Sequence, residues 1–143
     1  MGAPIIRRVT AADVGAVVEL WRVVFPEYGD PARPQRDAAA SVARKLSFGD
    51  ELFWLAERDG RVVGTAMAGY DGHRGWLYSV GVHPDARRSG VGAMLVAEAE
   101  RALAELGCPK VNLQVLPGNR EALEFWRRVG YVEDHVVPFG KRL

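Results

Sequence analysis

The segment from Trp76 to Leu106 constrains the fold of this chain more than any other. Residues 76–82 form a short apolar run typical of a strand, and residues 91–106 repeat apolar side chains at helical spacing. Between them, residues 83–90 hold a proline, two arginines and a glycine, which is the composition of a turn. A strand, turn and helix in this order predict a crossover to a parallel strand, which Val111, Leu113 and Val115 supply by their alternation.

The elements around this crossover predict an α/β fold. Apolar residues at 5–9 indicate a first strand, and Asp59-Gly60 predicts a type I′ turn between strands at 52–57 and 62–68. Helices are expected from Thr10 to Phe25, from Arg36 to Leu46 and from Asn119 to Val129, and a closing strand pair is expected over 131–143. We therefore expect one domain over residues 1–143. Its mixed sheet would have about seven strands, with a central parallel pair and antiparallel pairing elsewhere, and about four flanking helices.

Composition limits the classes of function. The 143 residues carry a formal net charge of +1, which argues against a nucleic-acid-binding protein. The single cysteine, Cys108, excludes an internal disulfide, and no apolar run has the length of a membrane span. We expect a cytoplasmic protein with neither nucleic acid nor membrane as partner. His83 and His135 lack metal-ligand spacing to carboxylates or to Cys108, so no metal is predicted.

The turn Arg87-Arg88-Ser89-Gly90-Val91-Gly92 has the features of a phosphate site. The first amides of a helix have no partner inside it, and the helix dipole adds positive charge there. Glycines let an anion approach the backbone, and arginines add charge-assisted hydrogen bonds. A P-loop lysine is missing, and Leu95 stands where a dinucleotide fingerprint needs its third glycine. The alternative is a glycine-rich helix start with solvated arginines.

Two motifs together resemble a known family. Val80-Gly81-Val82-His83-Pro84 followed by Arg87-x-x-Gly90-x-Gly92 looks like the acetyl-CoA motif of the GCN5-related N-acetyltransferases (GNAT). Asn119-x-x-Ala122-x-x-Phe125-Trp126-x-x-x-Gly130-Tyr131 is similar to the second motif of that family. The order of elements also matches, over nearly the whole chain. The segments 69–75, 107–110 and 140–143 resemble the small bacterial YpeA-type subgroup.

The resemblance implies a place for acetyl-CoA. The strand before the phosphate turn would carry a bulge, which we place at Gly81, and the pantetheine would lie along the strand; alternatively, Gly81 only relieves crowding against a helix. The N–H of Val82 would stabilise the oxyanion. The implied coenzyme-binding residues are Val80, Val82, Arg87, Arg88, Ser89, Gly90, Val91, Gly92 and Asn119. Asn119 also suits a helix cap.

The groups that move protons are less well defined. Trp126 stands where many relatives have the tyrosine that protonates the departing thiolate, and an indole N–H does not give up its proton near neutral pH. Water or a hydrogen bond then assists the thiolate, or Tyr78 or Tyr131 replaces the tyrosine, or the activity is weak. The turn that begins at Tyr70 holds Tyr70, Asp71 and His73, either as substrate contacts or as a solvated turn, with His73 a candidate base.

The predicted activity is acetyl transfer from acetyl-CoA to a primary amine of a small molecule or a protein. The acidic and aromatic segment 25–30, with Tyr28, indicates a loop over the acceptor site that accepts a cation. Two alternatives stay open: a catalytically weak or silent acyl-CoA-binding regulatory module, and a ribosomal-protein N-terminal acetyltransferase. Exposed strands near Phe139 would suit a homodimer.

Overall fold

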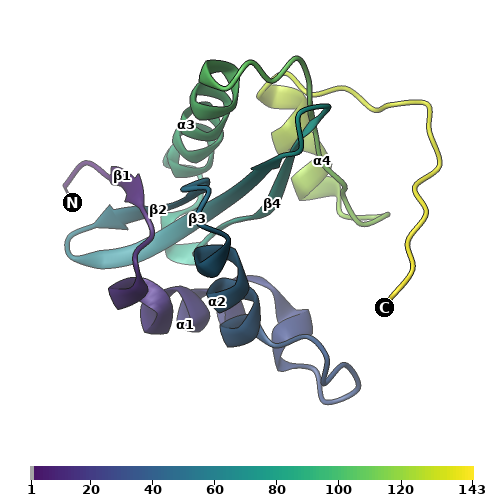
Figure 1. Ribbon diagram of the computed structural model, residues 1–143. Helices are drawn as coiled ribbons and strands as arrows, with labels where there is room; N and C mark the ends of the chain where they lie inside the picture. The colour runs from purple at the N-terminus through teal and green to yellow at the C-terminus, as the bar shows by residue number, and fades with distance from the viewer. Residues whose placement is uncertain (1) are drawn as a thin grey trace. The chain divides into compact units, whose positions relative to one another are not determined.

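A computed structural model describes residues 2–143 of the chain (Figure 1). The chain forms two compact units, one ending at Leu113 and the other spanning Gln114–Leu143. They are described separately. No helix within residues 2–143 is long and apolar enough to cross a membrane.

The first unit contains one sheet of five strands that lie in chain order. The strands are β1 (Ile5–Arg8), β2 (Phe53–Arg58), β3 (Arg61–Tyr70), β4 (Gly75–Val82) and β5 (Val111–Asn112). The first three pairings are antiparallel and β4 pairs with β5 in parallel, so the predicted mixed sheet is confirmed. About seven strands were expected, but this sheet has five. The difference is the strand pair that was expected over residues 131–143.

Local sequence explains the two sharpest connections of this unit. Asp59 and Gly60 join β2 to β3 with φ values of 51° and 75°, as a type I′ turn requires. Gly107, with φ of 84°, follows the C-cap residue Leu106 of the crossover helix and stops the helix in the left-handed conformation.

Helices cover both faces of the sheet. Helices α1 (Val14–Val24) and α2 (Ala38–Phe48) lie on one face, and α3 (Val91–Glu105) lies on the other (Figure 1). Short 3₁₀ turns precede or follow them: η1 (Ala11–Asp13), η2 (Pro26–Gly29) and η3 (Pro84–Ala86). The core on the α1 side consists of buried apolar residues of the helices and strands: Val9, Val17, Val18, Trp21, Ala38, Val42, Phe53, Leu55 and Met67.

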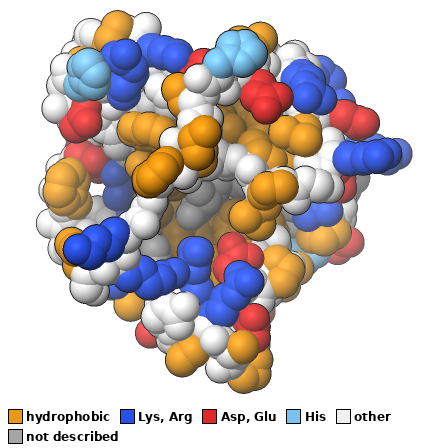
Figure 2. Space-filling model, turned by 90° about the vertical axis from the view of Figure 1, so that its right-hand side faces the viewer, with side chains coloured by type: hydrophobic (Ala, Val, Ile, Leu, Met, Phe, Trp, Pro, Cys, Tyr) orange, Lys and Arg blue, Asp and Glu red, His pale blue; other side chains and the backbone are white. Residues whose placement is uncertain are grey.

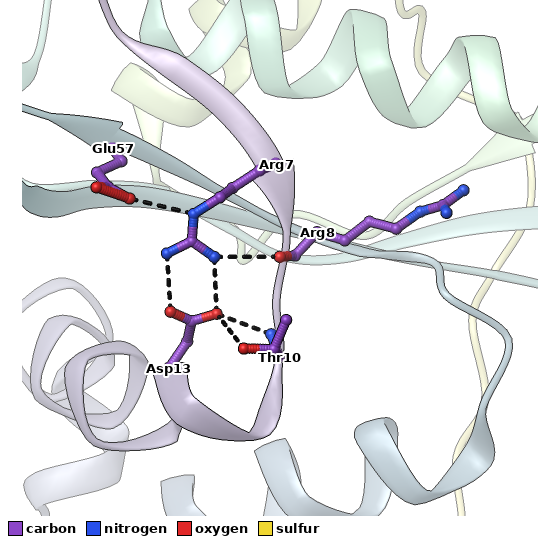
Figure 3. A network of polar contacts seen from close by, with 5 residues as sticks. All are labelled: Arg7, Arg8, Thr10, Asp13 and Glu57. Carbon is purple, nitrogen blue, oxygen red and sulfur yellow. Dashed lines mark hydrogen bonds and ion pairs between the residues drawn. The ribbon is translucent and has the colours of Figure 1, made fainter.

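A polar network fixes β1 against the start of α1 (Figure 3). The Arg7 guanidinium donates to both carboxylate oxygens of Asp13, at 2.9 and 2.8 Å, and to Glu57 on β2 at 3.1 Å. Asp13 also accepts from the Thr10 backbone N–H at 2.8 Å, as the predicted variant of a capping box requires. The bond from Arg7 holds the pKa of Asp13 far below its usual range.

The second unit contains helix α4 (Arg120–Arg128) and an irregular C-terminal segment. Asn119 caps α4, because its side-chain oxygen accepts from the Ala122 N–H at 3.1 Å. The closing strand pair predicted over 131–143 is wrong, since these residues form no strand. An extended segment needs a neighbouring edge for its backbone bonds, and Pro138 and Gly140 both weaken strand pairing.

Candidate functional site

The second half of β4 has an open edge. On one side β4 pairs with β3 along its length, but on the other side β5 pairs only at Gly75 and Trp76. From Leu77 to Val82, no strand of residues 2–143 pairs with that other edge. The pairing of β4 with β5 therefore ends at Trp76 and leaves backbone groups of β4 beyond it available to a ligand.

A bulge interrupts β4 at Ser79 and Val80. Thr65 of β3 lies opposite Gly81 and Met67 lies opposite Tyr78, so two residues of β4 face one residue of β3. Ser79 has a φ of 48°, which is uncommon for a residue with a side chain. The predicted bulge exists, but its position at Gly81 is corrected to Ser79 and Val80.

Gly81 has a different role from the one predicted. A Cβ built on Gly81 would lie 2.5 Å from Val24 Cγ1 and 2.8 Å from Phe25 Cζ. The end of α1 thus packs directly on the β4 backbone, and only glycine leaves room for it. This observation supports the alternative that Gly81 relieves crowding against a helix.

A buried hydrogen-bond chain holds the bulge. Thr65 is fully buried, accepts from Trp21 Nε1 at 2.9 Å and donates to the Ser79 carbonyl at 2.9 Å. The strained residue of β4 is therefore tied through Thr65 to the core of α1. Neither Ser79 nor Thr65 is among the site residues predicted from the sequence. The available signal was a lone threonine inside the apolar run 62–68.

The Val82 N–H points to the open edge. Gly81 lies opposite Thr65, and the His83 N–H donates to Val63 O on β3 at 2.7 Å. Backbone groups of an antiparallel strand alternate in direction, so the N–H and C=O of Val82 face away from β3. The Val82 carbonyl accepts from Arg87 Nε at 3.1 Å on that side.

The residues of the predicted phosphate turn come together directly after β4. Arg88 and Gly90 both have left-handed backbones, with φ values of 62° and 83°. The Met94 N–H donates to the Gly90 carbonyl at 3.0 Å, which begins the hydrogen-bond ladder of α3. The N–H groups of Val91, Gly92 and Ala93 precede it and have no acceptor inside the helix. This geometry suits an anion at the start of α3.

The flanks of the turn are fixed by side-chain contacts. Arg87 is anchored to the Val82 carbonyl, and the Ser89 hydroxyl donates to the Ala86 carbonyl. Nothing lies within 4 Å of a Cβ built on Gly90, so its surroundings are open. The predicted turn residues thus adjoin Val82 at one end of β4.

The turn between β3 and β4 lies at the other end of β4. The Asp71 carboxylate accepts from the backbone N–H groups of Arg74 at 2.9 Å and His73 at 2.7 Å, which lower its pKa. The two ends of β4, Gly75 and Val82, are about 20 Å apart along a strand of this length. The structure therefore does not bring Tyr70, Asp71 or His73 to the phosphate turn.

Tyr78 lies on β4 between the β3–β4 turn and the predicted phosphate turn, next to the bulge. Its ring stacks on Trp76 with centroids 6.4 Å apart, and its side chain is about half exposed. Burial, and secondarily the charge of Asp71, raise its pKa above the ordinary value. The phenol is thus protonated at neutral pH and able to donate a proton.

Tyr28 belongs to the side of the sheet covered by α1. Its ring stacks on Trp21 at 5.5 Å and meets Phe25 edge-on at 6.2 Å. Because Phe25 borders Gly81, Tyr28 is one aromatic ring away from β4.

Trp126 and Asn119 belong to the second unit. The Trp126 ring meets Phe125 at 5.0 Å and Tyr131 at 5.2 Å, both edge-to-face. The Tyr131 N–H also donates to the Trp126 carbonyl at 2.9 Å. Both aromatic residues are thus part of the packing around α4, and Asn119 is its cap.

No group of three His, Cys, Asp or Glu side chains gathers in a metal-binding arrangement within residues 2–143.

Comparison with known proteins identifies relatives over most of the chain. The model of the acetyltransferase (GNAT) family matches residues 15–131. An acetyltransferase of Sodalis glossinidius (strain morsitans) is 41% identical over 132 residues, which cover 92% of this chain and 89% of that protein. Among solved structures, an N-acetyltransferase of Thermoplasma acidophilum in complex with coenzyme A superposes with a TM-score of 0.84 at 17% identity, covering 95% and 94% of the two chains. The aminoglycoside N-acetyltransferase AAC(6')-Iy in complex with CoA superposes with a TM-score of 0.79 at 23% identity, covering 98% and 95%.

Proposed function

Because this chain belongs to the GNAT family of acetyltransferases and is an acetyl-CoA-dependent N-acetyltransferase, we propose that it acetylates a primary amine of a small molecule or a protein. The observation that carries this proposal is the open edge of β4, which leads from the bulge at Ser79 directly into the anion-suited turn at Arg87–Gly92. The family match spans both compact units, which supports one functional domain over residues 1–143.

The turn after β4 binds the pyrophosphate of the coenzyme in this proposal. The free N–H groups at the start of α3 and the helix dipole attract the phosphates. Arg87, Arg88 and the Ser89 N–H lie at the flank, and Gly90, Val91 and Gly92 provide the backbone contacts. The pantetheine follows the open edge of β4, where the backbone of Val80 and Val82 takes the place of a strand partner.

Acetyl transfer needs an oxyanion donor and a path for two protons. The neutral amine attacks the thioester carbonyl carbon, the C–S bond breaks, and the amide product and the coenzyme thiolate separate. The Val82 N–H points to the side where the oxyanion forms, and a fixed backbone donor of this kind lowers the barrier. The amine loses its proton to water in this proposal, since His73, the candidate base from the sequence, lies at the opposite end of β4 from Val82.

Tyr78 is the group that we favour to protonate the thiolate. Its phenol carries a proton at neutral pH, and it adjoins the bulge at Ser79. The Trp126 indole cannot donate a proton in this way. The acceptor contacts proposed from the sequence, Tyr28, Tyr70, Asp71 and His73, lie on the elements that border β4.

Replacement of Gly90 by alanine tests the coenzyme site. A side chain at its left-handed φ costs about 1 kcal/mol of backbone strain and also approaches the bound phosphates. Gly72 is a matched control, since its φ is 87°, nothing lies within 4 Å of its Cβ, and it lies at the other end of β4. We expect both variants to lose similar stability in urea unfolding, while only Gly90→Ala weakens acetyl-CoA binding, by about tenfold or more in calorimetry. Undiminished binding in Gly90→Ala would contradict the assignment.

A thiol-release assay with a panel of amines distinguishes an active enzyme from a silent binder. The proposal expects turnover in the wild type and its loss in Tyr78→Phe with acetyl-CoA affinity retained. Tight binding without turnover, and none gained in Trp126→Tyr, would instead identify an acyl-CoA-binding module.

A further inference from the structure

A pocket of about 350 Å³ lies between the C-terminal half of α1 and the start of α2. Arginines Arg22, Arg33 and Arg36 line it together with Asp30, Asp37 and Tyr28. Figure 2 shows basic and acidic side chains intermixed in the lower half of the face. No step of the proposed acetyl transfer uses these charges.

Both carboxylates of the pocket are already engaged. Asp30 pairs with Arg33 at 3.7 Å and accepts from the Ala32 N–H at 2.9 Å. Asp37 caps α2 by accepting from the Ala40 N–H at 3.2 Å. The two acidic side chains therefore have local structural contacts, but only Asp30 forms an ion pair.

The guanidinium groups of Arg22 and Arg36 form no close ion pair. Among residues 2–143, no carboxylate lies within 4.0 Å of either group. With three arginines and two aspartates, the pocket carries a net charge of +1. The planar fork-shaped guanidinium groups match carboxylate and phosphate oxygens. This preference is opposite to the cation preference expected from the sequence of segment 25–30.

The pocket adjoins the part of β4 where acetyl transfer is proposed. Tyr28 forms part of its wall and packs on Phe25 at 6.2 Å. The Phe25 ring in turn lies against Gly81, next to the bulge. A molecule anchored in the pocket thus extends past one aromatic ring to reach β4.

We propose that Arg22 and Arg36 bind an anionic group, a carboxylate or a phosphate, on the amine acceptor. The acceptor is then an amine that also carries an acidic group, such as an amino acid or a peptide with a nearby carboxylate. Polycationic amines are disfavoured by repulsion from the two arginines. The assignment to an acceptor rests on the proposed acetyltransfer, whereas anion binding by the pocket does not.

Titration of the ¹⁵N-labelled full chain with small probes tests the pocket itself. Succinate and inorganic phosphate are the anionic probes, and neutral succinamide is the matched control. We expect the anions to shift the amide signals of residues 28–38 and succinamide to leave them in place. The variant Arg22→Gln/Arg36→Gln should lose about tenfold or more of the anion affinity, while Arg44→Gln, on an exposed part of α2 outside the pocket, should not.

The absence of shifts with either anion, or equal affinity in the double variant, would overturn the anion site. A larger effect of phosphate than of succinate would identify a phosphorylated acceptor instead of a carboxylate.

The acceptor assignment is tested with matched amines. Each amino acid or dipeptide is compared with its carboxamide in the thiol-release assay at saturating acetyl-CoA. We expect a lower KM for the acid form in the wild type and in Arg44→Gln, and equal KM values for the two forms in Arg22→Gln/Arg36→Gln. A preference for the carboxamide, or no change in the double variant, contradicts this assignment. Anion shifts without any turnover would refute the proposed function but leave the anion site intact.

Discussion

Thr65 illustrates how one residue connects the core to the reactive strand. It is fully buried, and its hydroxyl satisfies the Trp21 indole N–H and the carbonyl of the strained Ser79 at once. Burial of an unsatisfied polar group costs more than a hydrogen bond contributes. The geometry of the bulge therefore depends on a side chain that no substrate needs to touch.

Replacement of Thr65 by valine keeps the shape but removes both hydrogen bonds. We expect the free energy of unfolding in urea to fall by about 1–3 kcal/mol and acetyl-CoA binding to weaken, because Ser79 loses its support. Thr65→Ser keeps the hydroxyl, so its affinity for acetyl-CoA should match the wild type. If Thr65→Val bound acetyl-CoA as the wild type does, the positioning role would be refuted.

Among the elements, the packing of α1 on β4 determines how close Phe25 comes to the β4 backbone beside the bulge. Gly81 allows this contact, since any Cβ there would overlap Val24 and Phe25. The contact brings Phe25 and Tyr28 next to the open edge of β4.

The variant Gly81→Ala should force the end of α1 away from β4. We expect a loss of about 1–3 kcal/mol in the free energy of unfolding, as overpacking in a core costs. Gly69→Ala is the control, because the nearest atom to its Cβ, Tyr78 Cε2, lies 4.0 Å away. Equal stability of the two variants would contradict the close packing.

The joint between β1 and α1 gives a pH-dependent stability. Arg7 lowers the pKa of Asp13 in the folded state, so the ion pair stabilises the fold above the unfolded pKa of about 4 and loses this effect as the pH falls. We expect Asp13→Asn to cost about 2 kcal/mol near pH 7 and progressively less toward pH 3, measured by urea unfolding. The exposed pair Arg8–Glu51, at 3.3 Å, is the control, and Glu51→Gln should cost under about 1 kcal/mol. If the cost of Asp13→Asn stayed the same as the pH is lowered, the ion pair with Arg7 would not be its cause.

Sequence patterns predicted the elements whose causes are local. The Asp59-Gly60 turn, the cap at Asn119 and the helix stop at Gly107 depend on residues within a few positions, and all were correct. The bulge was misplaced because its position depends on Thr65 and Trp21, which are distant in sequence. The strand pair over 131–143 was wrong because alternation cannot reveal whether a partner edge exists. The Arg87–Gly92 turn stays a predicted phosphate site, whose contiguous residues have a backbone that suits an anion. The charged pocket between α1 and α2 could not be predicted, because it depends on how the two helices pack.

At the scale of the whole molecule, the two compact units differ in how much they bury. All of the buried hydrophobic side chains lie between Val9 and Leu103, and no residue of 114–143 is buried. In the C-terminal segment, Val136, Val137 and Phe139 are 73%, 79% and 94% exposed. The first unit therefore supplies most of the stability of the fold.

Deletion of residues 136–143 should change the free energy of unfolding by less than about 0.5 kcal/mol, because the side chains removed bury little surface. Urea unfolding of dilute protein measures this effect. Light scattering of the same samples tests whether the exposed apolar residues also mediate the homodimer expected from the sequence. A large loss of stability in the monomeric deletion variant would show that the segment contributes to the core.

The bulge at Ser79 and Val80 has a consequence for solubility as well. An open strand edge is a template on which other chains add strands and aggregate, and proteins avoid this by twisting or interrupting such edges. In β4, the irregular backbone at Ser79 breaks the regular spacing of donors and acceptors that an incoming strand would need. We therefore expect this edge to resist pairing with a second polypeptide, so that the bulge beside the proposed coenzyme site also limits aggregation.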